Sequence, residues 1–168
     1  AFDDDNITHV NNKVDPLDDI ETINLELTVA DLDSINKRYA KVEKVARTKD
    51  KAAMAEFAIL KKIKPVLEAG KPVRSLDFAE DEQKIVKGLF LLTSKPVLYV
   101  ANIAEADMAD PLKCKYVQQI KQYADSEGSG MLAVCAKTEE EIAQLDDDDK
   151  QEFLEAEGVE ESGLDRLI

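Results

Sequence analysis

The sequence predicts an α/β fold with parallel strands, into which an antiparallel pair of helices is inserted. Two short apolar runs, residues 97–101 and 131–136, alternate with amphipathic segments at residues 80–92, 111–124 and 138–145. Strands that alternate with helices in this way are joined by crossovers, so the two strands should be parallel. Residues 25–75 carry apolar side chains at helical spacing on both sides of a short link, which predicts the inserted pair of helices.

The first helix of this pair should be entered at Asp15-Pro16, which offers a helix N-cap with proline at the first helical position. The residues before it are expected to form a loop or a strand remnant. A tight link at residues 48–50 should join the two helices, and Gly70 should end the second one after a kink at Pro65. The apolar stripes expected to face each other are Leu32, Ile35, Tyr39, Val42 and Ala46 on the first helix, and Ala53, Phe57, Leu60, Ile63 and Leu67 on the second.

The charges of this hairpin are mostly basic in an otherwise acidic chain, which makes it the best candidate for contact with rRNA or an acidic partner. A merely solvated helix face is the alternative. The basic residues are Lys37, Arg38, Lys41, Lys44, Arg47, Lys49, Lys51, Lys61, Lys62 and Lys64.

Polar residues follow both predicted strands. Asn102 and Glu105 come after the first strand, and Cys135-Ala136-Lys137 ends the second. Ligands of open α/β sheets bind beyond the carboxyl ends of the strands, and an asparagine amide can both donate to and accept from a purine edge. The same residues are also compatible with a plain turn or cap asparagine and a buried cysteine.

Composition excludes several classes of protein. A length of 168 residues allows one domain, or one domain with an insertion, and 44% apolar residues suffice for a core. A net charge of −14 argues against a general nucleic-acid binder and against sequence-specific DNA recognition. No run of about 18 apolar residues predicts a membrane span, and no signal peptide is apparent. Cys114 and Cys135 have no metal-binding or disulfide spacing, so a cytoplasmic location is expected.

The chain contains no G-x-x-x-x-G-K-[ST] motif, so the loop that cradles phosphates is absent from these residues. Phosphoryl transfer depends on such a loop and on bound Mg²⁺, and no catalytic residue is therefore assigned. His9 is interpreted as a structural residue rather than a general base. The acidic runs at residues 3–5 and 146–149 are interpreted as a loop and a solvated helix start, not as metal sites.

Several motifs resemble the YchF or Obg-like ATPase family, a group of TRAFAC-class P-loop NTPases. They are residues 2–10, residues 14–21, residues 27–37 around Ala30-Asp31-Leu32, and in the tail residues 152–154, Gly158 and residues 160–168. The resemblance covers essentially the whole chain. It implies parts of a nucleotide-binding, OBG-type G domain at residues 1–24 and 76–168, with a helical coiled-coil insertion at residues 25–75. It also implies an internal piece of a longer protein, whose P-loop and TGS domain lie outside these residues.

The resemblance further implies that the whole protein binds and hydrolyses ATP in preference to GTP and associates with the ribosome through the large subunit. Guanine-selective relatives carry N-K-x-D, whereas here Ile103 and Glu105 stand at the lysine and aspartate positions. The implied base-binding residues are Asn102, Ile103 through its backbone, Glu105, and Cys135 and Ala136 in a loop similar to S-A-K. Mg²⁺ would be held by residues outside this chain, and the piece alone should be inactive. The alternatives are a non-catalytic interaction module acting through the hairpin, and an Obg-type GTPase.

Overall fold

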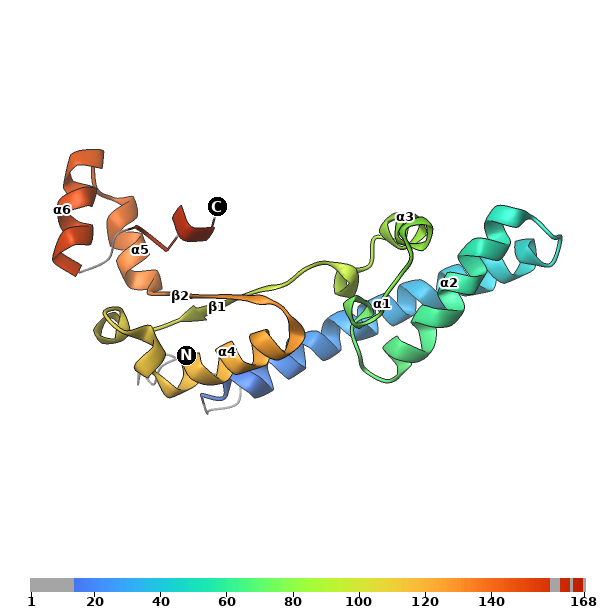
Figure 1. The fold of residues 1–168 in the computed structure, drawn as a ribbon, viewed down its shortest axis with the longest axis horizontal. Helices are drawn as coiled ribbons and strands as arrows, with labels where there is room; N and C mark the ends of the chain where they lie inside the picture. The colour runs from blue at the N-terminus through green and yellow to red at the C-terminus, as the bar shows by residue number, and fades with distance from the viewer. Residues whose placement is uncertain (1–13, 158–160, 164, 168) are drawn as a thin grey trace. The chain divides into compact units, whose positions relative to one another are not determined.

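The computed structural model describes residues 14–157, 161–163 and 165–167, so His9 and the acidic run at residues 3–5 lie outside the described residues (Figure 1). The chain forms two compact units. We call Ile20–Pro96 the hairpin unit, and Ala1–Asp19 together with Val97–Ile168 the sheet unit. They are described separately below, and the domain boundaries expected at residues 24/25 and 75/76 stay a prediction.

Two long helices dominate the hairpin unit. Helix α1 (Pro16–Ala46) begins at the expected proline, and the Asp15 carboxylate accepts a hydrogen bond from the Asp18 backbone N–H at 3.4 Å. Helix α2 (Lys51–Glu68) is capped by Asp50, which accepts from the Ala53 N–H at 2.7 Å. The helix continues through Pro65 to Glu68, and Gly70 follows with a φ of +72°, the left-handed conformation that favours glycine at a helix end.

The two predicted stripes form the core of this unit, which confirms the antiparallel pairing. Every stripe residue is buried or packs against the buried cluster. The rings of Tyr39 and Phe57 meet with centroids 4.9 Å apart, and Arg38 forms an ion pair with Glu56 across the helices. Ile59, at 2% exposure, is a core residue that the predicted stripes did not include.

The helix predicted over residues 80–92 is shorter. Helix α3 (Glu80–Gly88) ends four residues early, and residues Leu92–Ser94 form a separate turn of 3₁₀ helix. The cause is a tertiary contact, because the carboxylate of Asp31 on α1 accepts from the backbone N–H groups of Leu92 and Thr93 at 2.9 and 2.7 Å. Those two donors would otherwise be committed to the continuing helix.

The sheet unit contains two parallel strands, as predicted. Strand β1 (Leu98–Asn102) pairs with β2 (Gly130–Val134), with Leu98 opposite Gly130 and Asn102 opposite Val134. Helix α4 (Lys115–Glu127) makes the crossover and turns Val117, Ile120 and Ala124 into the core. It starts four residues later than expected, because Pro111–Lys113 form a 3₁₀ turn before it.

Two short helices follow β2. Helix α5 (Ala136–Ala143) begins two residues after the strand, and helix α6 (Asp147–Glu157) begins within the acidic run, which is therefore a helix start as expected. Among the described residues, no helix is both long and apolar enough to span a membrane.

Candidate functional site

The carboxyl ends of β1 and β2 lie side by side in the sheet unit and are joined by direct hydrogen bonds. Asn102, the last residue of β1, accepts through Oδ1 from the backbone N–H of Ala136 at 3.0 Å. The N–H of Ile103 donates to the carbonyl of Val134 at 2.8 Å. Parallel pairing thus brings the two predicted loops together, and residues 102–105 and 135–137 are called the strand-end site below.

An ion pair connects the same two loops. Lys137 Nζ lies 2.8 Å from a carboxylate oxygen of Glu105, and 3.8 Å from one of Glu141 on the next turn of α5. The pKa of Lys137 is raised, first by its hydrogen bond with Glu105 and then by the charges of Glu105 and Glu141. All three side chains are well exposed, so solvent screens the pair and it adds little stability. In the structure the pair directs the Glu105 carboxylate toward the start of α5.

Lys137 was not among the residues assigned from sequence to the base site. The motif that contains it was recognised, but no pattern in the sequence indicates that Lys137 reaches Glu105, 32 residues earlier in the chain. This contact depends on the register of β1 and β2.

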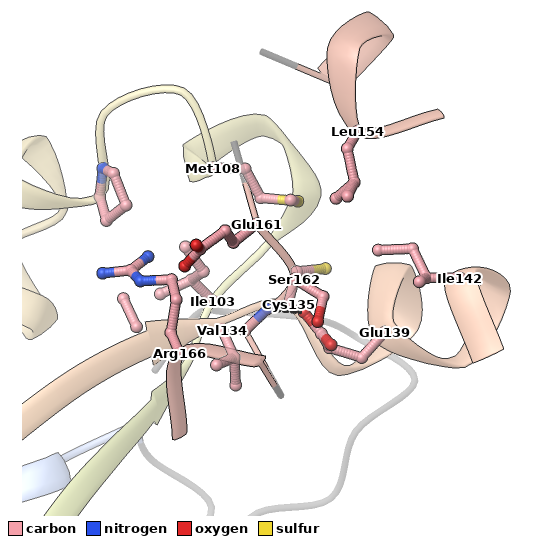
Figure 2. A pocket seen from close by; sticks show the side chains of 13 residues that line it. Ile103, Met108, Val134, Cys135, Glu139, Ile142, Leu154, Glu161, Ser162 and Arg166 are labelled. Carbon is pink, nitrogen blue, oxygen red and sulfur yellow. Dashed lines mark hydrogen bonds between the residues drawn. The ribbon is translucent and has the colours of Figure 1, made fainter. Parts of the chain in front are cut away.

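The five predicted site residues divide into an exposed and a buried group. Asn102, Glu105 and Ala136 are exposed at the strand ends. Ile103 and Cys135 are 2% and 5% exposed, and their side chains line a pocket behind the strand ends (Figure 2). Only the backbone of Ile103 and Cys135 can therefore contribute to a site at the strand ends.

The rest of this pocket comes from the segment after β1, the end of β2, helices α5 and α6, and the described part of the tail. Its lining includes Met108, Ile142, Leu154, Glu161, Ser162 and Arg166 (Figure 2). The N–H of Gly163 donates to Glu139 at 2.6 Å, and a Cβ at Gly163 would lie only 2.6 Å from a methyl carbon of Val134. Glycine is required here by the close approach of the tail to β2. The tail motif that contributed to the family resemblance thus packs directly against the second strand of the site.

Chemically, the strand-end site offers an oriented carboxamide, a held carboxylate and backbone groups at a sheet edge, which suit recognition of a planar, hydrogen-bonding ring such as a purine. Within the described part of the chain, no group of three or more His, Cys, Asp or Glu side chains is placed to hold a metal ion.

Comparison with known proteins gives concordant matches, although no family model matches the chain. Over its whole length the chain is 56% identical to the ribosome-binding ATPase YchF of Bacillus subtilis and 43% identical to that of Escherichia coli O157:H7, covering 46% of each. It is 37% identical over 171 aligned residues to Obg-like ATPase 1 of Caenorhabditis elegans, covering 43% of that protein.

The fold agrees with these sequence matches. The solved structure of the Schizosaccharomyces pombe YchF GTPase matches 99% of this chain with a TM-score of 0.83 at 31% identity, and the match covers 46% of that structure. The chain therefore spans about half the length of the relatives it matches. Over the part of those relatives that it spans, this chain belongs to the YchF or Obg-like ATPase family.

Proposed function

We propose that this chain supplies the base-binding part of a ribosome-associated nucleotide-binding protein that hydrolyses ATP in preference to GTP. The observation that carries the proposal is the connection of two adjacent parallel strand ends by the Asn102–Ala136 hydrogen bond and the Glu105–Lys137 ion pair. A purine site needs polar groups held at such an edge, and these contacts hold them. The names of the relatives, ribosome-binding ATPase and Obg-like ATPase, support the nucleotide and ribosome parts of the proposal.

Asn102 orients the loop that contacts the base, and the backbone at Ile103 recognises the adenine amino group. Glu105 lies beside the base at the strand-end site. The backbone at Cys135 and Ala136 closes over the ring. In the whole protein, phosphate binding, Mg²⁺ coordination and the attacking water are assigned to residues outside this chain, and the ribosomal contact to the large subunit.

The preference for ATP follows from the state of the Glu105 carboxylate. Guanine presents two donors, N1–H and the N2 amino group, which need a carboxylate to accept them. Glu105 is already paired with Lys137, and it carries one methylene more than the aspartate of N-K-x-D. Leaving guanine's donors unpaired costs roughly 1–3 kcal/mol per group, whereas adenine has no such donor pair at that edge. The S. pombe relative is described as a GTPase, so base choice is the part of the proposal that most needs a direct test.

The test uses the whole protein and competition between labelled ATP and unlabelled ATP or GTP. The unmodified protein should bind ATP more tightly. The double variant Glu105→Asp, Lys137→Gln shortens the carboxylate and releases it from its partner, and GTP affinity should then rise relative to ATP by about tenfold, equivalent to about 1.4 kcal/mol. Ile103 is kept, because a lysine at this buried position would place an ammonium group in the interior.

Two control variants separate the effect of shortening the carboxylate from the effect of releasing it from Lys137. Lys137→Gln alone releases the carboxylate but keeps the extra methylene of the glutamate, so it should raise the ratio of GTP to ATP affinity by less than the double variant does. Glu141→Asp makes the same change of side chain one turn further along α5, and should have no effect on the ratio. If the double variant folds and its ratio equals that of the unmodified protein, base choice does not reside in Glu105.

A further inference from the structure

Positive charge is concentrated in one part of the hairpin unit. Residues 37–64 contain ten Lys and Arg but only three acids, in a chain whose net charge is −14. All three acids have partners. Glu43 pairs with Arg47 at 3.0 Å, Asp50 accepts from the Ala53 N–H, and Glu56 is bound by Arg38. Glu43 and Glu56 are thus neutralised by their own partners, whereas Asp50 keeps its charge and offsets one of the remaining cations.

Most of the cations along the helices are also occupied. Lys37, Lys62 and Lys64 pair with Asp33, Glu82 and Glu68, and the ammonium group of Lys61 lies 4.5 Å from the centre of the Phe57 ring. Four lysines remain, namely Lys41, Lys44, Lys49 and Lys51. All four are exposed, and none forms an ion pair with another described residue.

These four lysines lie together at the closed end of the hairpin, which we call the hairpin tip. Lys41 and Lys44 occupy the last two turns of α1, Lys49 lies in the link, and Lys51 is the first residue of α2 (Figure 1). Lys49 has a φ of +64°, a conformation uncommon for a residue with a side chain. Residues 41–51 contain five Lys and Arg and two acids, so the tip keeps a net charge of +3, whereas the cations further along the helices are paired.

We propose that the hairpin tip is a docking surface for the phosphate backbone of RNA. Lysine ammonium groups are compact point charges that bind phosphate without a fixed geometry. The aromatic rings of α1 and α2, Tyr39 and Phe57, pack against each other between the two helices and not in the link at the tip. The tip therefore suits contact with phosphates and not the reading of bases. Since the rest of the chain is strongly acidic and repels RNA, the tip would be the point of approach. The inference names the contact surface for the ribosome association proposed above and rests on that part of the proposal.

The experiment compares two variants of the whole protein that lose the same charge. In the tip variant, Lys41, Lys44, Lys49 and Lys51 become glutamine, which removes charge and preserves helix propensity. In the control variant, four exposed lysines from the other end of the same unit, Lys71, Lys84, Lys87 and Lys95, become glutamine. Circular dichroism and the urea midpoint establish that both variants fold. Binding to purified ribosomes and to ribosomal RNA freed of protein is then measured between 50 and 200 mM salt.

For the unmodified protein, four phosphate contacts contribute about 100-fold to the loss of affinity across this range of salt. The tip variant should lack this contribution on both ribosomes and free RNA, and the control variant should keep it. A tip variant with the salt dependence of the unmodified protein would overturn the proposal. An effect on ribosomes but not on free RNA would assign the tip to an acidic protein surface instead. If the unmodified protein binds neither probe, the proposed ribosome association itself fails, and this inference with it.

Discussion

The most informative perturbation of the fold is the removal of the Asp31 carboxylate. Asp31 lies in the middle of α1, is only 3% exposed, and accepts three hydrogen bonds from the segment after α3. Two come from the N–H groups of Leu92 and Thr93 and one from the Thr93 hydroxyl, at 2.7–2.9 Å. The same hydroxyl accepts from the N–H of Val73, so one carboxylate connects three segments of the hairpin unit.

The expected cost of Asp31→Ala follows from the burial of its partners. Thr93 is 1% exposed, so its N–H and hydroxyl would lose their acceptor in the interior, at about 1.5–3 kcal/mol each for a bond to a charged group. Leu92 is 43% exposed, so water can replace the carboxylate at its N–H. The two together cost about 3–6 kcal/mol of unfolding free energy. Asp31→Asn keeps one acceptor oxygen and should cost about half as much.

Urea unfolding and amide hydrogen exchange measure this effect. The matched control is Asp33→Ala on the same helix, which removes only an exposed ion pair with Lys37 and should cost less than about 1 kcal/mol. Exchange at Leu92 and Thr93 should accelerate in Asp31→Ala and not in the control. The reasoning is refuted if the two alanine variants have equal midpoints, or if the Thr93 amide stays protected without the Asp31 carboxylate.

Three further predictions concern other parts of the chain. Leu60→Ala, in the fully buried core, should lower the unfolding free energy by about 2–5 kcal/mol. Met54→Ala, at a half-exposed position of the same helix, is the control and should cost under about 1 kcal/mol. Equal urea midpoints of the two variants would mean that the apolar stripe of α2 has been assigned to the wrong face of the helix. Gly163→Ala should release the tail from β2, because the added methyl group would overlap Val134, and limited proteolysis should then cut the tail faster. In the control Gly88→Ala nothing lies within 4 Å of the added methyl group, and the rate of cleavage in the tail should not change. The pKa of Glu82 is lowered, first by its hydrogen bond with Lys62 and then by the hydrogen bond from the N–H of Ala79. Lys62→Met removes the first of these and should raise the pKa of Glu82, which NMR titration of the carboxyl group measures. Because the pKa of Glu82 is lower in the folded protein than in the unfolded chain, the ionised carboxylate stabilises the fold at neutral pH, and this contribution is lost as the pH falls through the folded pKa. An unchanged titration of Glu82 in the Lys62→Met variant would show that the ion pair does not form in solution.

The fold class and the helical hairpin could be predicted from the amino-acid sequence. Apolar residues spaced by three and four, an Asp-Pro entry, a short link at residues 48–50 and Gly70 at the exit are local signals, and each acts within a few residues of its own position. The two strands were predictable for a similar reason, because short apolar runs between amphipathic helices leave few arrangements other than a parallel pair. The strand ends, and with them the candidate site, followed from that pairing.

Which side chains of the site face the surface depends on tertiary packing and could not be predicted. Ile103 and Cys135 occupy positions that resemble base-binding motifs, yet their side chains are buried against α5, α6 and the tail. The early end of α3, caused by a carboxylate some 60 residues away, and the pairing of Glu105 with Lys137 across 32 residues are equally invisible in the sequence. Hydrogen bonds between distant segments depend on register and packing, whereas periodicity and capping depend on neighbours in the chain.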